Sequence, residues 1–230
     1  MLLREPDLGL SECSRGSRPI RLTVWTHGLR PALNEMTNGI ARRLGAAVLV
    51  RPVMLGRGSI DEQLEHTDVL VWPGPGSPPV DDQAVTRIYR RVLRGMGLVL
   101  LHPGQASAAG ARLLSAPRVP AYPRHGERQV VWSVDPDHPI VRGVPNPLVI
   151  DGPGTRCEPS GLPRPDAIVL ASSLGGRPSS TGRVFLRGNG RIFYFSPGNQ
   201  DDRVYRHPDI QHLLANAVRW TARPMSGPAA

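Results

Sequence analysis

Lysine is absent from this chain of 230 residues, so all 28 of its basic residues are arginine. Glycine and proline are frequent, with 25 of each, and GC-rich coding favours both, together with arginine, at the expense of lysine. The formal net charge of +9 therefore reflects composition, and pairs such as Arg42-Arg43 and Arg90-Arg91 are scattered along expected helices. Aromatic residues make up only 5% and do not interleave with a basic run. We predict a solvated basic surface and no nucleic-acid partner.

Long hydrophobic runs are also missing, because no stretch reaches the roughly 18 apolar residues that a membrane-spanning helix needs. The first residues lack the apolar centre and small-residue cleavage site of a secretory signal. We therefore predict a cytoplasmic protein with no membrane partner. Cysteine is scarce: Cys13 and Cys157 form neither a C-x-x-C pair nor a zinc-ribbon spacing. We expect no structural disulfide.

One domain of ordinary to large size fits this length. Residues 1–18 are polar and rich in glycine, serine and arginine, which predicts a disordered leader. Residues 223–230 resemble them and predict a disordered tail. The folded domain is expected over residues 19–222.

Apolar strands alternate with amphipathic helices in the first half of this domain. Asp81 and Asp82 open a helix whose apolar residues keep a 3.6-residue period up to a glycine. Ser59 followed by Glu62 matches a capping box, which predicts a short helix through Leu64. Since strand, helix and strand in that order require a right-handed parallel crossover, the pattern predicts a doubly wound sheet. The expected strands are 20–25, 46–53, 67–72 and 97–102, with a further helix over 32–44.

Helices become rare in the second half. The sequence RGNGR, residues 187–191, is a strong hairpin signal between two apolar strands. The last helix is expected over residues 209–221. The fold class is thus a single α/β domain with a mainly parallel, doubly wound, flavodoxin-like sheet and a strand-rich second half. The expected strands of this half are 128–134, 147–151, 166–173, 183–188 and 191–196.

Ligands of open α/β sheets bind beyond the carboxyl ends of the strands, and this rule selects the candidate site residues. Several residues there are polar or glycine, and the loop 151–158 is a further candidate. From the residues alone, Asn199 and Gln200 after Pro-Gly are slightly better explained as ordinary turn residues than as site residues. Trp25 and Trp72 are interpreted as core rather than as sugar platforms. The strand-end candidates are Thr26, His27, Trp72, Gly74, His102, Gly104, Gln105, Gly198, Asn199 and Gln200.

The chain resembles the ThuA (trehalose utilisation) family from about Ile20 to Trp220. The resemblance is carried by TDVLVWPGPG, VLRGMGLVLLHPGQAS, WSVDPDHPIVRGV, GNGRIFYFSPG and YRHPDIQHLLANAVRW. It implies the fold of the class I glutamine amidotransferases. It also implies a role in carbohydrate metabolism, around trehalose and keto-disaccharides, such as isomerisation of a 3-keto-sugar.

The chain departs from the family where members carry histidine. Gln105 replaces a histidine after the fourth strand, and Asn199-Gln200 replaces a His-Glu pair. Before the last helix Arg206 takes the histidine position and His207 lies one residue later. Amides keep hydrogen bonding but lose basicity, so these changes favour binding over proton transfer.

His102 and Glu158 remain as candidate catalytic residues, and His102 has an equally good structural interpretation. From the family's acidic segment we also retain Asp151 as a ligand-binding candidate, and we add His207, which lies just before the last helix. We predict no metal site, since the surviving histidines and carboxylates fall short of a ligand set, and no cofactor. No cysteine lies in the turn directly after the fourth strand, where His102-Pro103-Gly104-Gln105 stands, which excludes glutamine amidotransferase chemistry.

Two functions stay open at this point. The first is a ThuA-like protein that binds a small carbohydrate and carries an isomerase-type activity. The alternative is a non-catalytic relative that binds a ligand or a partner protein after losing the family histidines. The sequence leaves open whether the chain forms a homo-oligomer.

Overall fold

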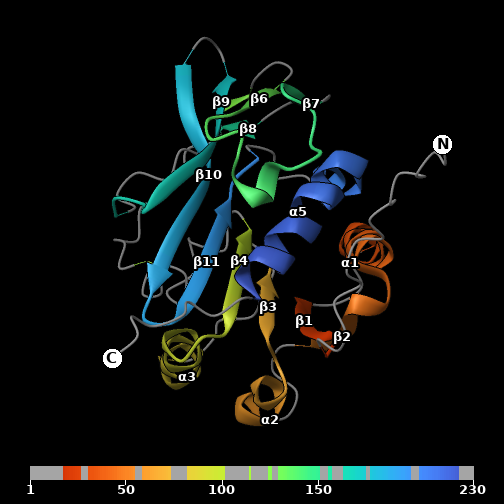
Figure 1. Ribbon diagram of the computed structural model, residues 1–230, viewed down its shortest axis with the longest axis vertical. Helices are drawn as coiled ribbons and strands as arrows, with labels where there is room; N and C mark the ends of the chain where they lie inside the picture. The colour runs from red at the N-terminus through yellow and green to blue at the C-terminus, as the bar shows by residue number, and fades with distance from the viewer. Residues whose placement is uncertain are drawn as a thin grey trace, which may run out of the picture.

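A nine-stranded mixed sheet forms the centre of the described structure, in the order β2-β1-β3-β4-β11-β10-β9-β6-β7 (Figure 1). The computed structural model describes residues 18–26, 31–54, 59–73, 82–101, 114, 124–125, 129–150, 155–156, 163–174, 177–197 and 202–222. The strands of the sheet are β1 (Ile20–Thr26), β2 (Val48–Met54), β3 (Val69–Trp72), β4 (Gly97–Leu101), β6 (Gln129–Ser133), β7 (Leu148–Ile150), β9 (Ala167–Leu174), β10 (Arg177–Arg187) and β11 (Gly190–Phe195).

Five strands, β2, β1, β3, β4 and β11, are parallel neighbours, as the alternating strand and helix pattern predicted. The last four, β10, β9, β6 and β7, continue the sheet in antiparallel pairings. The single α/β domain with a doubly wound sheet and a strand-rich second half is therefore confirmed. The helices are α1 (Pro31–Leu44), α2 (Ile60–Glu65), α3 (Asp82–Leu93) and α5 (Pro208–Thr221), and the 3-10 turns are η1 (Gly45–Ala47), η3 (Pro139–Val141) and η4 (Asp202–Arg206).

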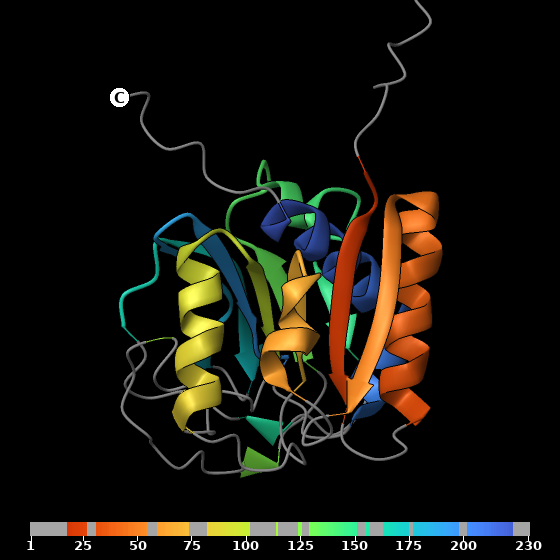
Figure 2. The ribbon, with the colours of Figure 1, turned by 90° about the horizontal axis from the view of Figure 1, so that it is seen from below.

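Helices cover both faces of the parallel half (Figure 2). Helices α1 and α5 pack with Val71 and Leu101 in one hydrophobic core. Helices α2 and α3 pack with Leu70 and Leu100 in the other. Neighbouring strand residues thus enter opposite cores, so β3 and β4 are buried along their whole length.

Two predicted turn signals can be compared with the structure. Residues 188–189 join β10 to β11 as the hairpin that RGNGR indicated, and Gly188 has a φ of 57°. The predicted capping box at Ser59 is wrong in one respect. Ser59 is the N-cap residue of α2, but its side chain makes no capping hydrogen bond. The Ser59 carbonyl accepts the first backbone hydrogen bond of the helix, from Gln63 N–H.

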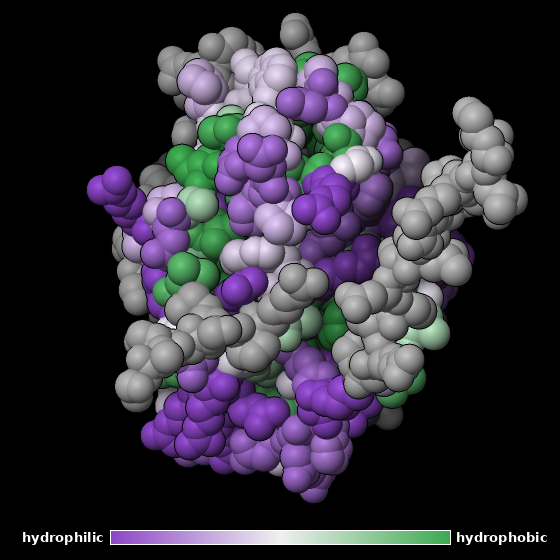
Figure 3. Space-filling view, viewed as in Figure 1, coloured by the Kyte–Doolittle hydropathy of each residue, from purple (hydrophilic) through white to green (hydrophobic). Residues whose placement is uncertain are grey.

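The surface over α3 is strongly hydrophilic (Figure 3). Arg90 and Arg94 are exposed. Arg87 forms an ion pair of 3.1 Å with Asp61 of α2, and the exposed Glu65 lies on the same helix. The basic residues of this end are thus mixed with acidic ones, which is the pattern of a solvated charged face.

Candidate functional site

The carboxyl ends of β1, β3, β4 and β11 lie level with one another at one edge of the sheet. Val24 of β1 is paired with Val71 of β3. Trp72 at the end of β3 is paired with Leu100, and Leu101 at the end of β4 is paired with Phe195. Four neighbouring strands therefore end at the same edge, which we call the carboxyl edge. In Figure 2 the arrowheads of β1 and β2 point towards this edge.

The connections reverse direction between β1 and β3. After β1 the chain enters α1, which packs in one core, and after β3 it enters α3, which packs in the other. In doubly wound sheets such a reversal is the topological switch point, where ligands bind between the diverging connections. Thr26 and Trp72 are the last residues of these two strands.

Three of the predicted site residues belong to the described part of the chain: Thr26, Trp72 and His207. Thr26 pairs with Met54 at the end of β1. The remaining candidates lie outside the described residues, and their roles stay predictions. They are His27, Gly74, His102, Gly104, Gln105, Asp151, Glu158, Gly198, Asn199 and Gln200.

The strand-end tryptophans are core residues in this structure, as their interpretation from sequence indicated. Trp25 and Trp72 are both 0% exposed, and their ring centroids lie 4.8 Å apart in an edge-on arrangement. The Trp72 ring is therefore packed within the sheet's own core, and a contact with a ligand stays a prediction.

His207 is the N-cap residue of α5, the helix that follows β11. Its Nδ1 accepts a hydrogen bond of 3.2 Å from the backbone N–H of Asp209. This capping bond occupies Nδ1 and requires it to be unprotonated, which leaves Nε2 as the nitrogen that could meet a ligand. The neighbouring Arg206 is exposed, and its Nε lies 3.2 Å from a carboxylate oxygen of Glu35 on α1.

A hairpin rises past the carboxyl edge on the antiparallel side. Phe195 ends β11 opposite Gly182, whereas β9 and β10 continue through residues 171–174 and 177–181. At about 3.4 Å per residue, the extra β10 segment rises roughly 17 Å, and Figure 1 shows it extending beyond β11. We call these two segments the projecting hairpin. Strand β7, which precedes Asp151, ends level with the projecting hairpin. Its last residue, Ile150, pairs with Gln129 of β6, and β6 in turn pairs with β9 of the hairpin.

Buried polar residues line this part of the sheet, and the sequence pattern did not single them out. Thr181 and Ser172 are 1% and 3% exposed, and the Thr181 hydroxyl donates to the Ser172 hydroxyl over 2.6 Å. Ser196 N–H donates to the Thr181 carbonyl. Gln129 is 3% exposed, and its Oε1 finds no hydrogen-bond partner among the described residues. In the sequence these residues appear only as a few polar residues within apolar strands. The two-residue period of a strand assigns such residues to the solvent-facing side, so it did not predict their burial.

The carboxylate with the largest pKa shift among the described residues, that of Asp68, lies just before β3, at the opposite edge of the sheet. Partial burial raises the pKa of Asp68, but hydrogen bonds from Arg18 and Arg21 outweigh it and hold this pKa well below its usual range. Burial lowers the pKa of His138, whose Nδ1 accepts from the Ile140 N–H and caps η3. These groups are structural, and none of them belongs to the carboxyl edge.

Metal ligands do not gather in the described part of the chain. No group of three or more histidine, cysteine, aspartate or glutamate residues that could hold a metal ion occurs among these residues. None of the described helices is long and apolar enough to cross a membrane.

The profile of the ThuA family, described as trehalose utilisation, matches residues 25–221. The chain belongs to the ThuA family. The match begins at Trp25 on β1 and ends in the last turn of α5. It therefore spans the switch point, the projecting hairpin and helices α1, α2, α3 and α5 of the ThuA domain.

Solved structures agree with this fold. A ThuA-like protein from Parabacteroides merdae ATCC 43184 has a TM-score of 0.68 at 16% identity, over 89% of this chain and 90% of that one. A ThuA-like protein from Bacteroides uniformis ATCC 8492 has a TM-score of 0.64 at 15% identity, over 90% and 93%. A protein described as a GMP synthase subunit, from Thermoplasma acidophilum, has a TM-score of 0.54 at 16% identity, over 89% and 97%. At these identities the likeness shows the fold alone. No functionally curated protein matches the chain.

Proposed function

We propose that this ThuA-family protein binds a small carbohydrate of the trehalose or keto-disaccharide class beyond the carboxyl edge. One observation carries the proposal: the level ends of β1, β3, β4 and β11. His102 follows β4 directly in the chain, and Asn199 and Gln200 follow β11 by a few residues. Amide side chains both donate and accept hydrogen bonds, as recognition of sugar hydroxyls requires.

The proposed chemistry is a proton shift in a keto-sugar. His102 takes the proton from the carbon beside the carbonyl, and the electron pair of that C–H bond forms the C=C bond of an enediol. Glu158 moves a proton between the two neighbouring oxygens, and His102 returns its proton to the former carbonyl carbon. Atoms and electrons balance without an oxidant or cofactor, and each transfer is ordinary general acid–base catalysis.

A second candidate function is binding without catalysis. It is favoured by the identity of Gln105, Asn199 and Gln200, which stand where family members carry proton-transferring or ligating side chains. In this case the same edge holds a sugar or a partner protein, and no conversion occurs.

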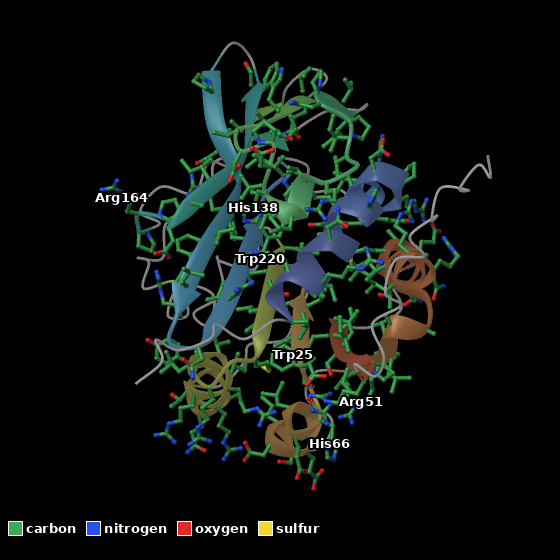
Figure 4. The ribbon with its side chains drawn as sticks, viewed as in Figure 1. Trp25, Arg51, His66, His138, Arg164 and Trp220 are labelled. Carbon is green, nitrogen blue, oxygen red and sulfur yellow. The ribbon has the colours of Figure 1, made fainter. Side chains whose placement is uncertain are left out.

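Nuclear magnetic resonance of sugar mixtures distinguishes the two candidates. Trehalose and 3-ketotrehalose are added to the purified protein, and both line broadening and the appearance of a new keto-sugar are followed. We expect conversion of the keto-sugar, and we expect the His102→Ala variant to be slower by a factor of about 10² to 10⁴. His66→Ala is the matched control, because His66 is exposed and lies before β3, at the opposite edge (Figure 4).

Each outcome decides one part of the proposal. Full turnover in the His102→Ala variant rejects His102 as the proton carrier. Binding by the wild-type protein without conversion selects the non-catalytic candidate. Absence of binding to either sugar rejects the carbohydrate assignment and leaves the family and the fold.

A further inference from the structure

The indole N–H of Trp25 is a buried hydrogen-bond donor without a partner among the described residues. The Trp25 side chain is 0% exposed, and no acceptor of the described part of the chain lies within hydrogen-bonding reach of its Nε1. Buried tryptophan N–H groups usually find an acceptor, because leaving the group unpaired costs the free energy of its lost hydration. An unpaired donor of this kind calls for a specific explanation, such as a water or a ligand.

The surroundings of Trp25 explain why its described neighbours offer no acceptor. The ring packs in the core between the sheet and helices α2 and α3, with Leu64, Leu70 and Val85 as members of the same cluster (Figure 4). The edge of one tryptophan ring meets the face of the other at the Trp72 contact, with an interplanar angle of 72°. Such an apolar shell fixes the orientation of the indole and leaves its N–H to be satisfied from outside this cluster.

The position of Trp25 connects this donor with the carboxyl edge. Trp25 is the last residue but one of β1, and continuation of the β1–β3 register sets it beside Trp72, the last residue of β3. These two strand ends flank the topological switch point, where doubly wound proteins bind their ligands. A rigid, preoriented donor at this place costs little side-chain entropy when a ligand binds.

We infer that the Trp25 indole N–H donates a hydrogen bond to a hydroxyl or keto oxygen of the carbohydrate bound at the switch point. The inference rests on the proposed function and deepens it, because it assigns a binding residue on β1 and turns the ligand towards the α2 and α3 side of the sheet. A sugar oxygen suits this donor better than a charged group, since the surrounding side chains are apolar and would not compensate a charge.

The experiment follows the indole N–H signals of the ¹⁵N-labelled protein during titration with trehalose and with 3-ketotrehalose. The Trp25→Phe spectrum identifies the Trp25 signal by its loss. We expect the chemical shift of this signal to change when the sugar that binds is added. We expect the Trp25→Phe variant to bind the sugar about 3- to 10-fold more weakly, which corresponds to one neutral hydrogen bond.

Two further variants separate the hydrogen bond from packing. Trp132→Phe is the matched control, because it also removes an indole but from a side chain that is 41% exposed on β6. We expect its affinity to equal that of the wild-type protein. Substitution of Trp25 by 3-benzothienylalanine keeps the bicyclic ring and replaces the N–H by sulfur, which cannot donate a hydrogen bond, so we expect the same loss of affinity even if Trp25→Phe folds poorly.

The results that overturn the inference are distinct from those that overturn the proposed function. If the wild-type protein binds the sugar and the benzothienylalanine variant binds equally well, Trp25 is not a donor to the ligand and the proposed function stands. The same conclusion follows if the Trp25 signal exchanges with a bound water and is unchanged by the sugar. If the wild-type protein binds neither sugar, both are rejected together.

Discussion

Replacing Asp68 by asparagine tests the contact that joins the beginnings of β1 and β3. The Asp68 carboxylate accepts five hydrogen bonds, two from the Arg18 guanidinium and three from the guanidinium and backbone N–H of Arg21, at 2.6 to 3.2 Å. The Asp68 side chain is 18% exposed, compared with 35% for Arg21 and 65% for Arg18. Asparagine has the same shape but removes the charge and one acceptor oxygen.

We expect Asp68→Asn to lower the free energy of unfolding at pH 7 by about 2 kcal/mol. Hydrogen bonds to a charged group contribute about 1.5–3 kcal/mol, and the exposed Arg18 pair adds little because solvent screens it. For a domain of this size, a loss of 2 kcal/mol lowers the Tm by about 4–8 °C. Urea unfolding at several pH values provides the measurement.

The pH dependence gives the sharper test. The folded-state pKa of Asp68 is well below its usual range, so its contribution is complete above the unfolded value of about 3.9 and is lost as the pH falls below it. The difference between wild type and Asp68→Asn should therefore shrink by about 1 kcal/mol between pH 7 and pH 3. Asp61→Asn is the control, since Asp61 is 65% exposed with one ion pair, and it should change stability by less than about 1 kcal/mol. An Asp68→Asn deficit that stays constant down to pH 3 would refute this account.

Substitutions at Gly190 and at His207 test the packing of the fold and the capping of α5. A Cβ at Gly190 would overlap the Val92 carbonyl, so Gly190→Ala should lower the free energy of unfolding by about 1–3 kcal/mol, measured by thermal or urea unfolding. The control is Gly45→Ala, where space is open but φ is 57°, and it should lower the free energy of unfolding by about 1 kcal/mol. Wild-type stability of Gly190→Ala would contradict the observed hairpin contact. His207→Ala should lose about 1 kcal/mol with the α5 cap, and His207→Asn should restore it because asparagine is a good N-cap residue. Equal unfolding of the alanine and asparagine variants would show that the bond to Asp209 does not stabilise α5.

The sequence predicted the elements well where local patterning and burial agree. The run 97–102 carries five apolar or glycine residues before its histidine, and it becomes a buried central strand because helices cover both faces. The RGNGR turn was correct for a local reason, since Gly188 tolerates the positive φ that the tight connection needs. The capping box at Ser59 was wrong although Ser59 is the N-cap residue of α2, because a matching motif does not ensure that the side-chain bond forms.

The candidate site could be located but not assembled from the sequence. The strand-end rule and the family resemblance selected the carboxyl edge, and the register of β3, β4 and β11 brings those strand ends level. The buried pair Thr181 and Ser172, by contrast, joins residues of different strands, and only the register of β9 and β10 makes them partners.

By itself, the amino-acid sequence determined the order of strands and helices, the family, and the presence of amides instead of histidine at positions 105, 199 and 200, because these depend on residue identity and on periods of two or 3.6 residues along one chain. Only the tertiary structure decided which strands are neighbours, how far the projecting hairpin rises, and that the Trp25 N–H is buried without an acceptor among the described residues. Those properties depend on contacts between segments far apart in the chain, where long-range packing sets register, depth and hydrogen-bond partners.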